Sequence, residues 1–190
     1  MYLKLVPKTK LLYNMLIIKP ITENDCPFIV DLNAGKDADF LKQWAGGNVY
    51  TYPITLEQIK NHIKEETSQI FMIFDDEICV GSIELNKIDT KNRSANVCRF
   101  ILTENKKNNG LGTLVLKQLS NRAFKEMGLE KLTLNVFCFN VGAIRCYEKA
   151  GFLVKEYKQQ EDTKWNGYTM ELVKNNLKIR PIWKKKMSNI

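Results

Sequence analysis

Residues 110–127 constrain the fold most, because their apolar side chains recur at steps of four. Such steps place side chains on one face of an α-helix, so the segment predicts a long amphipathic helix. That face would carry Leu111, Val115, Leu119, Ala123 and Met127. Gly128 follows at once, and glycine readily adopts the left-handed conformation in which many helices end. A helix with so regular an apolar face must cover a larger apolar surface.

Strand-like segments on both sides of this helix supply that surface. Runs of apolar, β-branched and aromatic residues predict strands at 15–22, 69–74, 78–85, 95–102, 131–139, 152–157 and 168–173. The polar connections Asp75-Asp76-Glu77 and Asn166-Gly167 are typical of turns between antiparallel strands. The sequence therefore predicts a sheet that is mostly antiparallel.

Shorter helices are predicted between the strands. Their first turns carry the capping residues Thr22, Thr55 and Asn140. Residues 35–53, rich in turn formers and aromatic residues, are predicted to be a long irregular connection. The order is then strand, two helices, three strands, helix, strand, helix and two strands. This order indicates an α+β domain around one mixed sheet.

The chain of 190 residues suits one domain, and no repeat or linker divides it. We predict an N-terminal extension at 1–14, one domain at 15–173 and a basic tail at 174–190. No apolar run approaches the roughly 18 residues that cross a membrane, so no membrane partner is expected. No secretory signal is expected either, because the apolar stretch near the N-terminus is short and lacks a small-residue cleavage site.

The net charge of +8 is unevenly distributed along the chain. Residues 22–86 hold 12 acidic and 4 basic side chains, a balance of −8, and the remaining segments carry +16. A basic protein invites a nucleic-acid function, but the sequence has neither an RNA-recognition motif nor a helix-turn-helix signature. The segregation fits a chain in which one half serves an anionic ligand and the other a cationic one.

The cysteines and the single histidine point to no metal site. Five cysteines are scattered without C-x-x-C spacing, and His62 is alone. We expect the thiols to be reduced and structural in a cytoplasmic protein. His62 has polar neighbours on its predicted helix, so it is expected to be exposed rather than catalytic.

The loop that leads into the long helix carries the first functional motif. Gly110 and Gly112 let a ligand approach the backbone, and the first amides of a helix have no internal partner. A phosphate or pyrophosphate is the natural guest of such a site. The dinucleotide fingerprint G-x-G-x-x-G fails at Val115, and no P-loop is present. A simple glycine start to the helix remains an alternative for this segment taken alone.

The second motif runs from Asn135 to Phe152, and it discriminates between the interpretations of the first motif. Its pattern N-x-x-A-x-x-x-Y-x-x-x-G-F is matched at Asn140, Ala143, Tyr147, Gly151 and Phe152. The chain thereby resembles the GNAT superfamily of N-acetyltransferases, whose pyrophosphate signature [RQ]-x-x-G-x-[GA] is similar to 107–112. Lys107 stands where that family has Arg or Gln, which loses a planar fork or amide. The resemblance covers roughly residues 15–173.

The resemblance implies a GNAT-like fold, a mixed twisted sheet with helices on its faces and strands that splay at an acetyl-CoA site. It implies acetyl-CoA as cosubstrate, no metal, and direct aminolysis of the thioester. The pyrophosphate would be held by Lys107, Asn108, Asn109, Gly110, Leu111, Gly112 and Thr113. The backbone of Phe100, Ile101 and Leu102 would pair with the pantetheine arm. Asn140 and Tyr147 would flank the thioester.

Two residues are predicted to move protons during this transfer. Tyr147 would give the leaving sulfur its proton, since a phenol of pKa about 10 is protonated at neutral pH; an aromatic that only packs the helix is the alternative. Glu84 would take the proton of the amine, as carboxylates on central strands do in this superfamily. Its alternative is a strand residue that is solvated or paired with Arg99.

The acceptor is predicted to lie over the N-terminal helices, where Trp44, Tyr50 and Tyr52 would contact it or form an apolar lid. The acidic balance of residues 22–86 favours a cationic amine, either a small molecule or a protein N-terminus. The segment Phe40-Leu-Lys-Gln-Trp44 resembles the Rim-like branch that modifies ribosomal proteins. A non-catalytic acetyl-CoA-binding module and a basic protein associated with RNA or ribosomes remain alternatives, and a homodimer through an edge strand is left open.

Overall fold

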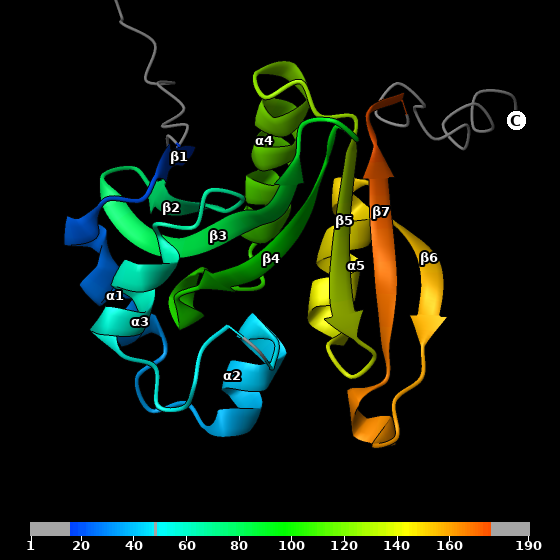
Figure 1. Ribbon diagram of the computed structural model, residues 1–190. Helices are drawn as coiled ribbons and strands as arrows, with labels where there is room; N and C mark the ends of the chain where they lie inside the picture. The colour runs from blue at the N-terminus through cyan, green and yellow to red at the C-terminus, as the bar shows by residue number, and fades with distance from the viewer. Residues whose placement is uncertain (1–15, 48, 176–190) are drawn as a thin grey trace, which may run out of the picture.

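The computed structural model describes residues 16–47 and 49–175, and it contains a seven-stranded sheet of order β1-β2-β3-β4-β5-β7-β6 (Figure 1). The strands are β1 (Leu16–Pro20), β2 (Gln69–Asp75), β3 (Ile78–Asp89), β4 (Ser94–Leu102), β5 (Lys131–Phe137), β6 (Leu153–Lys158) and β7 (Gly167–Val173). All neighbours are antiparallel except β4 and β5. The predicted α+β class with one mixed sheet is confirmed.

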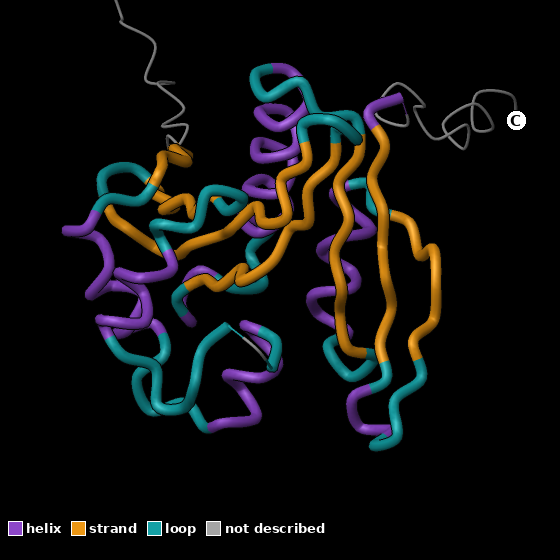
Figure 2. Tube along the Cα trace, in the orientation of Figure 1, coloured by secondary structure: helices purple, strands orange, loops and turns teal. Residues whose placement is uncertain are grey.

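Helices cover both faces of this sheet, as the tube in Figure 2 shows. One face packs against α4 (Leu111–Lys125) and α5 (Val141–Ala150), and the other against α1 (Cys26–Leu32), α2 (Ala38–Ala45) and α3 (Leu56–His62). The alternation of β2 separates the two cores, because Phe71 and Ile73 belong to the first while Ile70 and Met72 belong to the second. The extension and nearly all of the predicted tail lie outside the described residues.

Side-chain caps start the helices where the sequence predicted them. Thr55 and Asn140 accept hydrogen bonds from backbone amides of the first helical turn. Thr22 forms a capping box with Asp25, whose carboxylate accepts from the Thr22 amide at 2.8 Å. Gly128 has φ +70° just beyond α4, as a helix stop requires.

Helix α2 was not predicted, and the irregular connection expected at 35–53 is wrong over this span. Asp37 caps the helix, since its Oδ1 accepts from the amide of Phe40 at 2.8 Å. Leu41 and Ala45 are its buried residues, one helical turn apart. The helix has only two turns, and aromatic and turn-forming residues surround it. Its apolar residues are therefore too few for a helical spacing to be recognised in the sequence.

The central feature of the sheet is the divergence of β4 from β5. These strands pair at only three positions, from Ser94–Lys131 to Asn96–Thr133, and then separate (Figure 1). A bulge in β4 accompanies the separation, because Glu84 pairs with Cys98 while Ser82 pairs with Ile101. The splayed strands that the family resemblance implied are therefore present.

Gly81 on β3 is a condition for this bulge. A Cβ atom there would lie 2.3 Å from the carbonyl oxygen of Ile101 and 3.1 Å from Cα of Leu102. Both are backbone atoms, so no side-chain rotation could relieve the clash. The glycine lets the bulged strand approach β3 closely enough to stay in the sheet.

All five cysteines are free. Among the described residues, no helix is long and apolar enough to cross a membrane. The same part of the chain contains no cluster of three or more His, Cys, Asp or Glu side chains that could hold a metal ion.

Candidate active site

The loop before α4 presents a set of backbone amides without partners. The amides of Asn108, Asn109, Gly110 and Gly112 donate to no acceptor among the described residues. Asn108 and Gly110 adopt φ +61° and +89°, which turns the chain into the helix. The 15-residue helix α4 adds the positive end of its dipole. Free amides at such a helix start fit a pyrophosphate, so the loop suits the diphosphate of acetyl-CoA.

The lysines of this loop pair with carboxylates. The ammonium of Lys107 lies 2.7 Å from Glu104, and that of Lys106 lies 2.7 Å from Asp75. Their charges are therefore partly neutralised, and the backbone amides remain the main anion-binding groups.

Gly112 connects the loop to the other half of the site. A Cβ atom there would lie 3.1 Å from Sγ of Cys146 and 3.6 Å from the ring of Phe100. The first turn of α4 thus packs directly on α5 and on β4. This contact places the anion-binding loop beside the helix that carries Tyr147.

The backbone of β4 offers an open edge along the divergence. Ile101 and Leu102 pair with Ser82 and Gly81 of β3 on one side. On the side facing β5, the ladder ends at Asn96, so Phe100–Leu102 have no strand partner there among the described residues. An extended amide-containing arm can occupy such an edge as an added strand would.

Tyr147 and Asn140 lie on α5 and at its start. The ring of Tyr147 is partly buried and packs edge-on against Phe152 at 6.1 Å. Burial raises the pKa of Tyr147, so its phenol stays protonated at neutral pH. Its hydroxyl makes no hydrogen bond within the described residues. The Oδ1 of Asn140 accepts from the amide of Ala143 at 3.2 Å, so this side chain caps the helix.

Glu84 lies at the junction of the two strands and is nearly inaccessible, with 1% of its surface exposed. Its carboxylate accepts hydrogen bonds from Arg99 through two nitrogens, from His62 at 3.0 Å and from Ser68 at 2.5 Å. Three of these donors, from Arg99, His62 and Ser68, converge on Oε1, while Oε2 accepts from Nε of Arg99. Burial alone would raise the pKa of Glu84, but the bonds from Arg99 and His62 outweigh it and lower the pKa to about 2.

A buried carboxylate of such low basicity, held by four donors, is poorly suited to take a proton from an amine. The geometry therefore argues against the predicted role of Glu84 as a general base. It matches the alternative that the sequence left open, an ionised strand residue paired with Arg99.

His62 is the residue that the sequence interpretation placed wrongly. It was expected to be exposed, but its side chain is only 10% exposed and bonds to Glu84. Its ring also packs edge-on against Tyr50 at 5.3 Å. Because the Glu84 carboxylate is ionised, Nε2 of His62 must be the donor and Nδ1 is left as an acceptor when the ring is neutral. No local signal revealed this, because the partners are 22 residues apart.

Arg99 ties the helices of the second face to the bulge. It has φ +46°, an unfavourable conformation for a residue with a Cβ. Besides Glu84, its guanidinium bonds to the carbonyl oxygen of Ala45 at the end of α2, at 3.3 Å. The side chain thus holds the bulge on one side and the acceptor-facing helix on the other.

The three aromatic residues predicted to contact the acceptor lie in different environments. Trp44 and Tyr50 stack at 5.8 Å, and Tyr50 is 6% exposed, so Tyr50 is part of the core and cannot contact a ligand as it stands. Tyr52 is 56% exposed. The prediction is therefore corrected for Tyr50, which packs between Trp44 and His62.

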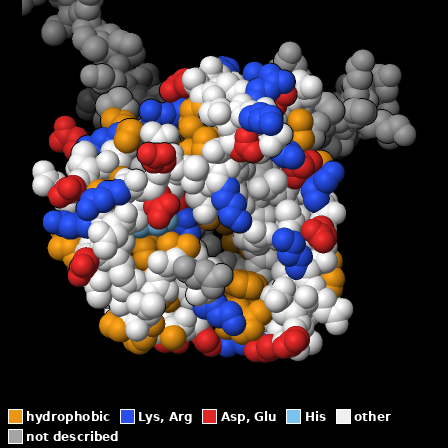
Figure 3. Space-filling model, viewed as in Figure 1, with side chains coloured by type: hydrophobic (Ala, Val, Ile, Leu, Met, Phe, Trp, Pro, Cys, Tyr) orange, Lys and Arg blue, Asp and Glu red, His pale blue; other side chains and the backbone are white. Residues whose placement is uncertain are grey.

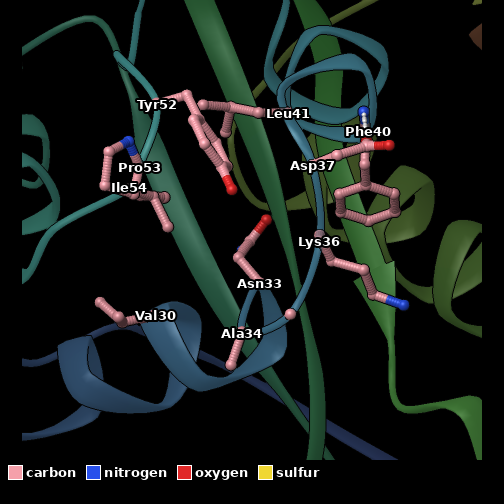
Figure 4. A pocket seen from close by; sticks show the side chains of 11 residues that line it. Val30, Asn33, Ala34, Lys36, Asp37, Phe40, Leu41, Tyr52, Pro53 and Ile54 are labelled. Carbon is pink, nitrogen blue, oxygen red and sulfur yellow. Dashed lines mark hydrogen bonds between the residues drawn. The ribbon is translucent and has the colours of Figure 1, made fainter.

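Tyr52 lines a cavity of about 350 Å³ between α1, α2 and the segment that precedes α3. Figure 4 shows the Tyr52 hydroxyl and the Asn33 amide oxygen pointing into it. That oxygen is buried and has no hydrogen-bond partner in the part of the chain that the structure describes. The walls are mostly apolar: Val30, Ala34, Phe40, Leu41, Pro53 and Ile54. Lys36 and Asp37 also line it, so the cavity combines apolar walls with polar and charged groups.

The surface is hollowed where the site lies. Figure 3 shows a depression near the centre of the face, over the region where β4 and β5 separate in Figure 1. Apolar side chains and a blue side chain, lysine or arginine, lie further below it. The anion-binding loop, the open edge of β4 and Tyr147 thus lie around the place where β4 separates from β5.

Comparison with known proteins identifies the family. The model of the acetyltransferase (GNAT) family matches residues 37–152. This is more than half of the chain, so the protein belongs to the GNAT family of acetyltransferases. It is an acetyl-CoA-dependent N-acetyltransferase, as its two motifs predicted.

Two curated relatives are distant in sequence. The spermidine N(1)-acetyltransferase of Vibrio cholerae is 22% identical over 149 residues, covering 78% of this chain and 84% of that protein. The acetyltransferase PseH of Campylobacter jejuni is 25% identical over 107 residues, or 56% of this chain and 64% of that protein.

Solved structures of the Vibrio cholerae enzyme share the fold. Its complex with CoA and spermine superposes with a TM-score of 0.72 at 19% identity, over 85% of this chain and 96% of that one. A dodecameric form gives a TM-score of 0.71 at 20% identity, over 87% and 98%. At this identity the likeness establishes the fold alone.

The glycine at the start of α4 can be tested against the one after its end. Gly110 and Gly128 both have positive φ and open space around them, at +89° and +70°. Gly110→Ala and Gly128→Ala should each lower stability by about 1–2 kcal/mol. Only Gly110→Ala should weaken acetyl-CoA binding, roughly tenfold, because it shifts amides that bind charged oxygens. Isothermal titration would measure both, and equal weakening in the two variants would refute the assignment of the loop.

The role of Glu84 gives a stability difference that depends on pH. A carboxyl whose pKa is lowered by folding stabilises the fold above its unfolded pKa, here 4.5, and loses that effect as pH falls towards 2. Glu84→Gln should therefore cost about 3 kcal/mol of unfolding free energy at pH 7, and the difference should shrink between these two values. Urea denaturation at several pH values measures it.

Glu130→Gln is the matched control, since Glu130 pairs with Arg93 at 2.7 Å on the surface and should cost about 1 kcal/mol or less. In the same Glu84→Gln variant, the acidic limb of the pH–rate profile should persist. Loss of that limb, with stability unchanged, would restore Glu84 as the base.

Proposed function

We propose that the amine acetylated by this protein is a polyamine or another small molecule with several ammonium groups. The observation that carries the proposal is the charge of the acceptor half. The helices and strands that form it come from residues 22–86, where acidic side chains outnumber basic ones 12 to 4. A negative field over the acceptor side attracts cations and raises their local concentration.

The relatives agree with a polycationic acceptor. The Vibrio cholerae protein that shares this fold is named for spermidine, and one of its structures holds CoA and spermine. Sequence identity near 20% does not transfer a substrate, so these names support the proposal without deciding it.

Acetyl transfer from acetyl-CoA requires an amine that has lost its proton and a proton for the departing sulfur. We assign the second task to Tyr147, whose phenol is protonated, is free of hydrogen bonds within the described residues and lies on the helix beside the anion loop. Glu84 acts as a positioning residue that holds Arg99 and the β4 bulge. The free amides of Asn108, Asn109, Gly110 and Gly112 and the open edge of Phe100–Leu102 hold the cosubstrate.

A protein N-terminus is the second candidate acceptor, because the segment Phe40–Trp44 resembles the Rim-like branch. It would call for an open acceptor side that admits a peptide. Association with ribosomes or RNA would accompany this function. A cytoplasmic location fits both candidates, and assembly into a homodimer or a larger oligomer is the corresponding proposal for quaternary structure.

The acceptor can be identified by thiol release with a panel of amines at one acetyl-CoA concentration. Spermidine and spermine should give kcat/KM at least tenfold above that of butylamine and of a peptide with a ribosomal-protein N-terminus. High salt should lower the advantage, because it screens the acidic field. Faster reaction with the peptide would contradict the proposal and favour the second candidate.

Tyr147→Phe tests the proton donor. It should lower kcat by roughly 10²–10⁴-fold, since general acid catalysis contributes about that much. The Kd for acetyl-CoA should stay within a factor of about two, because the ring and its contact with Phe152 remain. Unchanged kcat would reduce Tyr147 to a packing residue. Tyr157→Phe, on the exposed strand β6, is the matched control.

A further inference from the structure

Three aromatic rings form a cluster at the lower end of the divergence, where the acidic half meets the C-terminal half. Phe137 is the last residue of β5, and Phe139 lies two residues further along the chain. Trp165 ends the short 3-10 helix η3 (Thr163–Trp165). Phe137 and Phe139 stack at 5.6 Å, and each meets Trp165 nearly edge-on at 5.0 and 6.0 Å. We refer to these three residues as the aromatic cluster.

Two ammonium groups of the protein already lie on this cluster. Nζ of Lys42, from α2, is 4.0 Å from the centre of the Trp165 ring, and Nζ of Lys164 is 4.9 Å from it. Tryptophan is the aromatic residue that attracts cations most strongly. Trp165 is only 8% exposed, so its ring is covered by groups that include these lysines. The aromatic cluster is therefore chemically suited to bind an ammonium group.

The two lysines are held differently. Lys164 also pairs with Asp39 at 2.5 Å, and the nearby Asp162 and Asp37 add to the field that raises its pKa. Lys42 forms no ion pair within the described residues. Its ammonium is therefore held by the Trp165 ring alone. The energy of this contact is comparable to that of the contact another ammonium would make with the same ring. Of the two, Lys42 is the one that another ammonium could replace.

The cluster is connected to the elements that carry the groups assigned to the reaction. Phe137 precedes by three residues Asn140, which caps α5, the helix that bears Tyr147. On the opposite side, Lys42 belongs to α2, whose last residue accepts from Arg99 at the bulge. Figure 1 shows α2 below the end of β4 and η3 below β7, so their contact closes the lower end of the divergence. An acceptor that extends from the thioester towards this end of the divergence would lie beside this contact.

We propose that the aromatic cluster is a subsite for a second ammonium group of the acceptor, which displaces Lys42 from the ring of Trp165. This inference rests on the proposed function, because it supposes an acceptor with more than one ammonium. It specifies where the ammonium group that is not acetylated binds, and it explains why a monoamine would be a poorer substrate. Displacement exchanges one ammonium for another on the ring of Trp165, and it leaves the ion pair of Lys164 with Asp39 intact.

The test compares the ratio of kcat/KM for spermidine to kcat/KM for butylamine in three variants. Trp165→Phe keeps an aromatic ring against Phe137 but binds cations less well, so the ratio should fall roughly threefold to tenfold. Lys42→Met keeps the apolar stem and removes the competitor, so the ratio should rise. Lys19→Met is the matched control, because Nζ of Lys19 lies 4.1 Å from the ring centre of Phe74, on the β1–β2 side of the sheet. It should not change the ratio.

A double variant separates the ring from a general effect of charge. If Lys42 competes through Trp165, then Lys42→Met should raise the ratio less in a Trp165→Phe background than in the parent protein. An equal rise in both backgrounds, or no change of the ratio in Trp165→Phe, overturns the proposal. Thermal unfolding of each variant shows whether packing is retained, and the equally conservative Phe137→Leu gives a second test if Trp165→Phe is unstable.

Binding distinguishes failure of the subsite from failure of the proposed function. Spermidine is titrated calorimetrically into the protein with CoA present, independently of turnover. If spermidine is not acetylated but binds more weakly to Trp165→Phe and more tightly to Lys42→Met, the subsite stands and the acceptor assignment falls. If it is acetylated with the ratio unchanged in these variants, the subsite falls and the function stands. If it neither binds nor reacts, both fall.

Discussion

The separation of β4 from β5 is the constraint on which the rest of the site depends. Three paired positions join the strands, and beyond them the backbone of β4 has an unpaired edge. Unpaired amides and carbonyls inside a fold are unfavourable unless another group satisfies them. The open edge at Phe100–Leu102 is therefore stable only because a ligand or water can pair with it. Acetyl-CoA binding and the division of the sheet are two aspects of one arrangement.

The Glu84–Arg99 pair maintains this division. A left-handed backbone at Arg99 costs about 1–2 kcal/mol, whereas each hydrogen bond to a charged group contributes about 1.5–3 kcal/mol. The bonds of the guanidinium to Glu84 and to the Ala45 carbonyl thus exceed the strain of the bulge. Because those bonds reach α2 and His62 adds α3, one buried carboxylate aligns the acceptor-facing helices with the strand that holds the cosubstrate.

The two halves of the molecule differ in charge as well as in structure. Helices α4 and α5 provide the positive helix end, the free amides and the proton of Tyr147. The other half provides carboxylates, the cavity beneath Tyr52 and the lysine that rests on Trp165. Opposite fields on the two sides of one divide suit a reaction between an anionic donor and a cationic acceptor. The contact of α2 with η3 is where the halves meet at the lower end.

The sequence by itself determined the features that depend on neighbours along the chain. Period-four spacing gave α4, capping side chains gave the helix starts, and the two motifs gave the family and the anion loop. These signals are local, since a cap or a period needs only a few consecutive residues. Tertiary structure decided the rest. The environment of Glu84 depends on Arg99, His62 and Ser68, which lie 15 to 22 residues away, and on burial that no local pattern reports. The contact between Lys42 and Trp165 joins residues that are far apart in the sequence. Helix α2 is stabilised more by packing against the rest of the fold than by contacts within its two turns. Coulomb interactions and burial act through space, so only the folded chain could assign these roles.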